Sequence, residues 1–251
     1  MDEILHAGKY EIPVLYLDNH LLVVVKPPNL PTQADRSGDD DLLSILKRYI
    51  GERYNKPGAV YLGLVHRLDR PVGGVMVFAR TSKAASRLSE TFRTHEQDRR
   101  YLAVTEGEIA SEMTLEDDLI KDGRTGMVRV AKSGESGAKH AKLITRPVAV
   151  RQGLTLTEVQ LYTGRAHQIR VQHAHAGHPL WGDLRYGHGT PGHQIALWAA
   201  FLSLEHPTRH ERLDFASAPP AQGAWKLFQP EIGKMFARTG GPSPAKEQRE
   251  E

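Results

Sequence analysis

Residues Leu64–Arg80 read LVHRLDRPVGGVMVFAR, and Asp69 lies within their charged run, HRLDR at positions 66–70. Apolar residues precede the run, a proline and two glycines follow it, and Val75–Ala79 is apolar again. This order predicts a strand, an exposed turn and a second strand. One histidine and two arginines flank the Asp69 carboxylate, and nearby positive charge favours the ionised form. An ionised carboxylate suits nucleophilic or electrostatic work better than proton donation.

The composition is that of a water-soluble globular protein. The 251 residues are 39% hydrophobic and 25% charged, with apolar residues spread along the chain. No run approaches the roughly 18 apolar residues of a membrane span, and the acidic start, Met1-Asp2-Glu3, is unlike a signal peptide. We therefore expect a cytoplasmic protein with no membrane partner. The absence of cysteine excludes disulfides, thiolate metal sites and a thiol nucleophile.

The basic residues are clustered although the net charge is only +3, from 33 basic and 30 acidic residues. One cluster is Arg67 with Arg70, a second runs from Arg80 to Arg100, and a third runs from Arg165 to Arg185. Clustering of this kind indicates an anionic partner, and nucleic acid is the leading candidate.

Apolar periodicity and turn residues predict most elements of the chain. Strands are expected at residues 14–18, 21–25, 101–104, 127–131, 142–150, 154–162, 195–204 and 211–215. Helices are expected at residues 42–54, 83–96 and 225–237, and from the segment 163–170 to residue 176. Asp40 or Asp41 is expected to cap the first helix, and Thr81 or Ser82 the second.

Three regions lack a clear pattern of strands or helices. Residues 112–141 are polar and rich in Gly and Ser apart from the strand already named, so we expect mobile loops or a lid there. Residues 180–186 are expected to form a loop. Residues 238–251 have no apolar pattern and are expected to be disordered. No linker divides the remainder, so we expect a single domain over residues 1–237.

A histidine-rich segment invites a metal-site hypothesis, but its spacing argues against one. His173 and His175 lie two apart and diverge on a helix, and no histidine pair four apart occurs with a glutamate. The glycines match neither the dinucleotide-binding nor the phosphate-loop pattern. We therefore expect no metal and no small-molecule cofactor.

Three single residues attract attention, and each has an ordinary structural explanation. An aspartate in a basic turn, such as Asp69, is more often an ion pair or a cap than a catalyst. Arg170 could equally be a packed or surface arginine. Tyr101, at the start of a strand, could be a half-buried core residue. Spacing alone leaves these alternatives open.

The joint pattern resembles the RluA family of RNA pseudouridine synthases. The matching blocks are Lys26-Pro27; His66-Arg67-Leu68-Asp69 with Gly74; Arg100–Val104 with Gly107; and Gly164–Val171 followed by Gly177–Leu180 and Gly182-Asp183. Three of these blocks are extended motifs that occur in the family's order, and together they span about residues 14 to 215. Three ordered blocks are far more specific than any one of them.

The resemblance implies isomerisation of uridine to pseudouridine in ribosomal or transfer RNA by a monomer. The implied fold is α+β, the pseudouridine synthase fold, with a mixed, mainly antiparallel sheet, flanking helices and loops, and a central active-site cleft. It implies that Asp69 acts at C1′ of a flipped-out nucleotide, that Arg170 is its ion-pair partner, and that Tyr101 lies in the pocket. Candidate RNA-binding residues are His66, Arg67, Arg70, Arg165, His167, Gln168 and Ile169.

The chain also departs from the family. Val72-Gly73 stands where Thr-Ser is usual, and Ala166 stands where Thr or Lys is common. The hydrogen bonding of the Asp69 loop is therefore not explained by its own residues. Because the pattern begins near residue 12, we expect no N-terminal S4 domain. Two other functions stay open: an inactive RNA-binding protein with this fold, and a hydrolase of free nucleosides.

Overall fold

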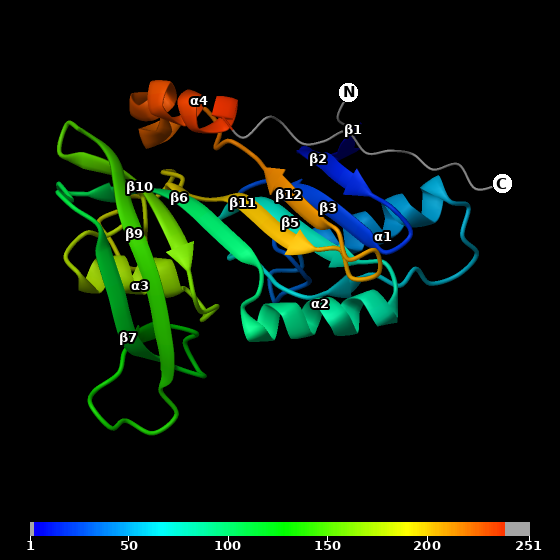
Figure 1. The fold of residues 1–251 in the computed structure, drawn as a ribbon, viewed down its shortest axis with the longest axis horizontal. Coiled ribbons are helices and arrows are strands. Elements are labelled where there is room, and N and C mark those ends of the chain that lie inside the picture. Colours follow the sequence, from blue (N-terminus) through cyan, green and yellow to red (C-terminus); the bar gives the residue numbers. More distant parts are fainter. Residues whose placement is uncertain (1–2, 239–251) are drawn as a thin grey trace. The chain divides into compact units, whose positions relative to one another are not determined.

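The computed structural model describes residues 3–238, with the side chain of Arg238 excepted, and divides the chain into two compact units. Unit 1 comprises Met1–Gln97, Phe201–Ser217 and Phe236–Glu251, and unit 2 comprises Asp98–Ala200 and Ala218–Met235. The ribbon in Figure 1 shows the helices and strands of both units. Among the described residues, no helix is long and apolar enough to cross a membrane.

Unit 1 is built on a sheet whose central strands are buried. Its strands are β1 (Glu3–Ala7), β2 (Tyr10–Leu17), β3 (Leu21–Lys26), β4 (Gly63–Leu64), β5 (Gly73–Ala79), β12 (Arg212–Ala216) and the later part of β11 (Leu197–Glu205). Antiparallel pairs join β1–β2, β2–β3, β3–β5, β4–β5 and β11–β12. Every residue of β3 and β5 is buried, which explains their continuous apolar sequences.

Two helices of unit 1 begin where the sequence predicts them. α1 (Leu42–Arg53) is capped by Asp41, whose side chain accepts the N–H of Ser44. α2 (Ser82–Thr94) is capped by Thr81, whose hydroxyl accepts the N–H of Ala84. Each cap satisfies a backbone donor that the first helical turn leaves unpaired. α2 packs against β4 and β5, the strands on either side of the Asp69 loop.

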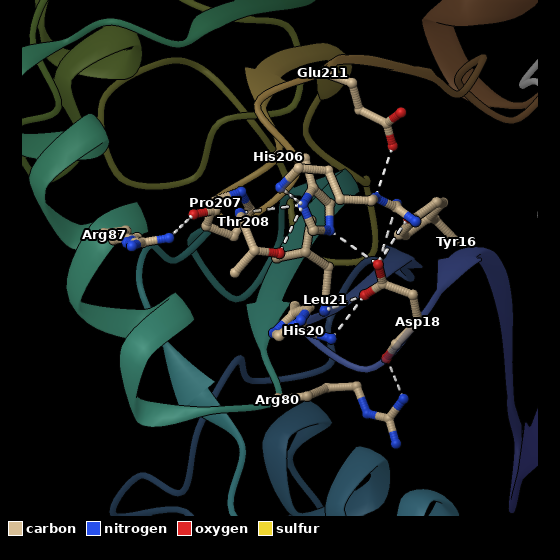
Figure 2. Close-up of polar contacts among 11 residues, drawn as sticks. Tyr16, Asp18, His20, Leu21, Arg80, Arg87, His206, Pro207, Thr208 and Glu211 are labelled. Atoms are coloured by element: carbon tan, nitrogen blue, oxygen red, sulfur yellow. Dashed lines mark hydrogen bonds and ion pairs between the residues drawn. The ribbon is translucent and has the colours of Figure 1, made fainter. Parts of the chain in front are cut away.

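A polar cluster around the buried His206 joins the β2–β3 turn to the connection after β11 (Figure 2). One oxygen of Asp18 accepts the N–H of Leu21 at 2.7 Å, and the other lies 2.9 Å from Nε2 of His206. Nδ1 of His206 accepts the N–H groups of Thr208 and Arg209. Because Nδ1 accepts these bonds, the proton of this fully buried imidazole sits on Nε2 and is donated to Asp18.

Unit 2 contains a second run of antiparallel strands. Its elements are β6 (Asp98–Glu106), β10 (Leu154–Leu161), β9 (Lys139–Arg151), β7 (Met113–Lys121), β8 (Val128–Val130), the start of β11, α3 (Gln168–His175), η1 (Gly223–Phe228) and most of α4 (Gln229–Arg238). Pairing runs β6–β10–β9–β7–β8. α3 packs on this sheet, where Val171 joins Leu119, Val128 and Ala141 in one buried cluster.

The expectation of loops through residues 112–141 is wrong, because the nine-residue strand β7 and the start of β9 lie there. Side chains of β7 alternate between the two faces, as in any strand. The pattern is hidden because Asp117 occupies a partly buried position between Leu115 and Leu119. Its carboxylate accepts a 2.7 Å hydrogen bond from the amide of Gln172 on α3. Gln172, which is distant in sequence, therefore satisfies the carboxylate of Asp117 on the inward face of the strand.

The other predicted strands and helices are confirmed, with shifts at their ends. The last helix is divided into the 3₁₀ helix η1 and the α-helix α4. The α+β class with mainly antiparallel pairing is also confirmed. A single domain over residues 1–237 and a central cleft stay predictions. Residues 239–251 of the predicted disordered tail lie outside the described residues.

Candidate active site

The Asp69 loop connects β4 to β5, and its backbone is held by segments far away in sequence. The carbonyl before Asp69, that of Leu68, accepts a 2.9 Å hydrogen bond from the buried hydroxyl of Thr32. The carbonyl after it, that of Arg70, accepts the N–H of Asn29 at 2.8 Å. The peptide groups on both sides of the half-buried Asp69 are therefore fixed.

Lys26 lies beneath the same loop with its whole side chain buried. Its ammonium donates to the carbonyl oxygens of Leu30 at 2.6 Å, Arg70 at 3.0 Å and Pro27 at 3.1 Å. Burial lowers the pKa of Lys26 to about 7, and the negative charge of Asp69 opposes that decrease. Asp69 thus has a buried lysine in its electrostatic environment as well as the arginines of its own run.

The departure at Val72-Gly73 has a structural explanation. Val72 is buried, and its N–H donates to the carbonyl of Asp69 at 3.0 Å, which closes a tight turn. Gly74 follows with a φ of +123°, a conformation that a side chain would disfavour. The loop therefore receives a hydroxyl from Thr32 and the side-chain nitrogen of Lys26, both of which lie outside the motif.

His66 is held by the packing of unit 1. Its Nε2 accepts the backbone N–H of Val77 at 3.0 Å, so the proton of the neutral ring is on Nδ1. The ring stacks on Phe92 of α2, with centroids 4.5 Å apart and planes 12° apart. These contacts fasten the start of the Asp69 loop to β5 and α2.

The two arginines of the loop are exposed, as expected of residues that contact RNA. Arg70 forms ion pairs with Asp39 and, at 3.8 Å, with Asp35. It also donates to the hydroxyl of Ser37. Arg67 is the second exposed arginine. An acidic segment at residues 35–39 therefore already contacts one of the cations predicted to bind phosphate.

In unit 2, Arg170 of α3 forms a bidentate ion pair with Asp183. Nε donates to one carboxylate oxygen at 2.8 Å, and Nη2 donates to the other at 2.7 Å. The two side chains are only 7% and 1% exposed. Burial by itself would raise the pKa of Asp183, but the guanidinium of Arg170, together with the backbone N–H groups of Arg185 and Tyr186, outweighs it and lowers that pKa below its ordinary value. The buried guanidinium and carboxylate thus compensate each other's charge.

Tyr186 covers the face of the same guanidinium. Cζ of Arg170 lies 5.1 Å from the centroid of the tyrosine ring, within the range of a cation–π interaction. The phenol oxygen accepts the N–H of Val128 at 2.9 Å and lies 2.7 Å from Nδ1 of His167. Tyr186 therefore packs on Arg170, and its hydroxyl group is held by Val128 and His167.

Two other candidate residues near α3, Gln168 and Arg165, form hydrogen bonds with backbone groups around them. The amide oxygen of Gln168 accepts from the hydroxyl of Thr163 and the N–H of Arg165, and its nitrogen donates to the carbonyl of Lys142. Gln168 and Ile169 are both buried. The side chain of Arg165 is exposed and donates to a carbonyl of β9 at 2.8 Å. Of these three, Arg165 is the one with solvent access.

Tyr101 lies buried on β6, opposite Val159 of β10. The neighbouring Arg99 is also held in a desolvated place, where burial lowers its pKa and Tyr101 opposes that decrease. A Cβ atom at Gly164 would lie 3.2 Å from the Arg99 guanidinium. The glycine that opens the third sequence block therefore makes room for this arginine.

Histidines of the predicted histidine-rich segment have individual structural uses. Burial lowers the pKa of His173 to about 4, and its Nδ1 lies 2.8 Å from the carbonyl of Ile169. The ring of His193 stacks on Trp181. Within residues 3–238, no group of three or more His, Asp or Glu side chains is arranged to hold a metal ion.

The candidate residues fall into one group in each unit. The Asp69 loop with Lys26 belongs to unit 1, while Tyr101 and Arg170 belong to unit 2. The predicted pairing of Asp69 with Arg170 joins residues of both units and stays a prediction. Lys26 and Asp183 stand in the matched blocks Lys26-Pro27 and Gly182-Asp183, but the resemblance assigns no role to either residue.

Comparison with known proteins points to one family. The family model "RNA pseudouridylate synthase" matches residues 20–175. A ribosomal large subunit pseudouridine synthase D from Pseudomonas aeruginosa is 33% identical over 241 residues, covering 88% of this chain and 72% of the relative. A tRNA pseudouridine synthase C from Pectobacterium carotovorum is 30% identical, with coverages of 92% and 67%.

Solved structures agree with the fold. Human RNA pseudouridylate synthase domain containing 4 superposes with a TM-score of 0.70 at 22% identity, covering 88% of this chain and 92% of that structure. Human RNA pseudouridylate synthase domain containing 1 gives a TM-score of 0.68 at 23% identity, with coverages of 96% and 100%. At these identities the likeness establishes the fold.

Proposed function

Because this chain belongs to the RNA pseudouridylate synthase family, we propose that it isomerises specific uridines of ribosomal or transfer RNA through Asp69. The RluA-type resemblance is confirmed by the family match and by the ribosomal large subunit synthases among its relatives. The observation that carries the role of Asp69 is its loop, in which both adjacent carbonyls are anchored and the buried Lys26 lies beneath. Fixed geometry of this kind is what a reacting carboxylate requires.

The reaction is an isomerisation and is balanced without a co-reactant. The N1–C1′ bond of uridine breaks, the uracil turns, and a C5–C1′ bond forms. The C5 proton leaves to solvent and N1 gains a proton. Breaking the glycosidic bond develops positive charge at C1′, and the Asp69 carboxylate stabilises that charge or bonds to the carbon.

Arg170 and Tyr101 complete the proposed chemistry. By the family resemblance, Arg170 is the ion-pair partner of Asp69 and orients its carboxylate. Tyr101 stacks on the target base or assists loss of the C5 proton. Both roles rest on the family resemblance, and both residues are buried enough to act away from bulk water.

RNA is bound around a nucleotide that has left its helix, because the reacting edge of uracil is inaccessible inside one. The exposed Arg67, Arg70 and Arg165 hold flanking phosphates, and His167, two residues after Arg165, contributes to the same contact. Gln168 and Ile169 support this surface from within. The protein acts as a cytoplasmic monomer.

The proposal is tested by mapping pseudouridine in unmodified transcripts of ribosomal and transfer RNA after incubation with the purified protein. We expect one or a few uridines to be converted. If the transcripts bind but no uridine changes, the protein is an inactive RNA-binding member of the family. If the transcripts are unchanged but added free uridine releases uracil, it is a hydrolase of nucleosides. Either result contradicts the proposed function.

A further inference from the structure

We propose that Asp183 is a positioning residue that fixes the orientation of the Arg170 guanidinium and thereby sets the rate of uridine isomerisation. This inference rests on the proposed function, which makes Arg170 part of the catalytic group. Asp183 follows Gly182 in the loop after α3; it stands in a matched sequence block, but the resemblance assigns it no role. Asp183, Arg170 and the residues that hold them in place all belong to unit 2.

The contact constrains the guanidinium in its plane. Two parallel hydrogen bonds of 2.8 and 2.7 Å join Asp183 to Nε and Nη2 of Arg170. A bidentate pair fixes both the position and the direction of the planar group, which a single hydrogen bond does not. Two of the five N–H donors of Arg170 are used in this way, so the group presents the others along a defined direction.

Asp183 is itself held in place. Its Oδ1 accepts the backbone N–H of Arg185 at 2.9 Å and that of Tyr186 at 3.2 Å. These bonds prevent the carboxylate from rotating away from Arg170. The preceding Gly182 has a φ of +76°, and a Cβ atom there would lie 2.8 Å from the carbonyl oxygen of Gln194. The loop therefore has little freedom to move Asp183.

Tyr186 limits movement of the Arg170 guanidinium out of its own plane. Its ring lies over the guanidinium, and its own orientation is set by Val128 and His167. Arg170 is thus held at its edge by Asp183 and at its face by Tyr186. The Arg170 guanidinium therefore cannot turn in another direction without breaking its two hydrogen bonds to Asp183.

Stability alone is a weak reason for such an arrangement. A buried ion pair loses the hydration of both charges, and well-packed apolar residues often stabilise a protein as well or better. The geometry instead suits a group whose direction matters in a reaction. Misplacement of a reacting group by about 1 Å can reduce a rate about 10²-fold.

The test is a double-mutant cycle with Asp183→Asn, Arg170→Lys and the double variant, with Asp118→Asn as a control on an exposed aspartate of β7. Asparagine keeps one acceptor oxygen and the side-chain shape, while lysine keeps the charge of Arg170 without its planar fork. Three quantities are measured: single-turnover release of tritium from C5-labelled transfer and ribosomal transcripts, RNA affinity, and the midpoint of urea denaturation.

We expect Asp183→Asn to slow turnover about 10²-fold while RNA affinity changes only a few-fold. Adding it to Arg170→Lys should slow turnover little further, because Asp183 acts through the arginine. Asp118→Asn should match the wild type.

Turnover by Asp183→Asn within about threefold of wild type would overturn the inference, as would independent, multiplying effects of the two substitutions. If Asp183→Asn fails to fold, Asp183→Glu keeps the charge and displaces the fork, and a wild-type rate in that variant would also overturn it. If the wild-type protein converts no uridine, the proposed function and the role of Asp183 both fail. This result is seen before any variant is measured, so it is distinct from a failure of the Asp183 role alone.

Discussion

The pKa of Lys26 makes a quantitative prediction about stability. In the folded chain the ammonium is buried beneath the Asp69 loop and its pKa is lowered from 10.5 to about 7. In the unfolded chain it is solvated and keeps its proton to about pH 10.5. Between these values the unfolded state binds more protons, so the free energy of unfolding rises with pH. Below pH 7 the stabilisation associated with the neutral amine is absent.

The size of the effect follows from the shift. One pKa unit corresponds to about 1.4 kcal/mol, so the full difference amounts to about 5 kcal/mol at most. Within the window, the slope is at most about 1.4 kcal/mol per pH unit. Lys26→Met removes the titrating group with little change in volume. It also leaves the carbonyls of Leu30 and Arg70 without this donor, which lowers the stability of the variant independently of the titration.

The assay is urea denaturation of the wild type and Lys26→Met, followed by tryptophan fluorescence from about pH 7.5 to about pH 9.5. The difference in unfolding free energy between the two proteins should increase with pH, because the other titrating groups are common to both. Lys83→Met, at an exposed position of α2, is the matched control and should leave that slope unchanged. A difference between wild type and Lys26→Met that stays constant over the range would refute the reasoning.

Two further substitutions test the Asp69 loop. Asp39→Asn removes the acidic partner of Arg70, so RNA affinity should rise about two- to fivefold, with a steeper dependence on salt, in filter-binding titrations; unchanged affinity would argue against a phosphate contact by Arg70. Thr32→Val removes the hydroxyl that satisfies the buried carbonyl of Leu68, and should cost about 1–3 kcal/mol in urea denaturation together with a slower turnover; full turnover would show that this anchor does not position the loop.

Local chemistry made most of the fold predictable. Asp41 and Thr81 mark the starts of α1 and α2, because their side chains accept the N–H three residues later. The turn between β9 and β10 is predicted by Gly153, which readily accepts a positive φ, whereas Gln152 takes the same conformation without being a residue that favours it. The strand β7 was missed because Asp117 is satisfied by Gln172, a partner that lies 55 residues away.

The sequence motifs of the candidate site could be predicted, but the residues that hold the motif residues in place could not. The blocks around Asp69, Tyr101 and Arg170 identify the family. Lys26, however, reaches Arg70 across 44 residues of sequence, and Asp183 meets Arg170 only because the chain turns back after α3. Contacts of this kind depend on the tertiary fold and leave no periodicity to detect.

The central claim is that the Asp69 carboxylate carries the isomerisation, and single-turnover tritium release from C5-labelled RNA tests it most directly. Asp69→Asn keeps the size and hydrogen-bonding capacity of the side chain but removes its charge and nucleophilicity. We predict that this variant releases no tritium above background while its RNA affinity stays within a few-fold of wild type, and that Asp118→Asn retains the wild-type rate. Release by Asp69→Asn at a rate comparable to wild type would contradict the account.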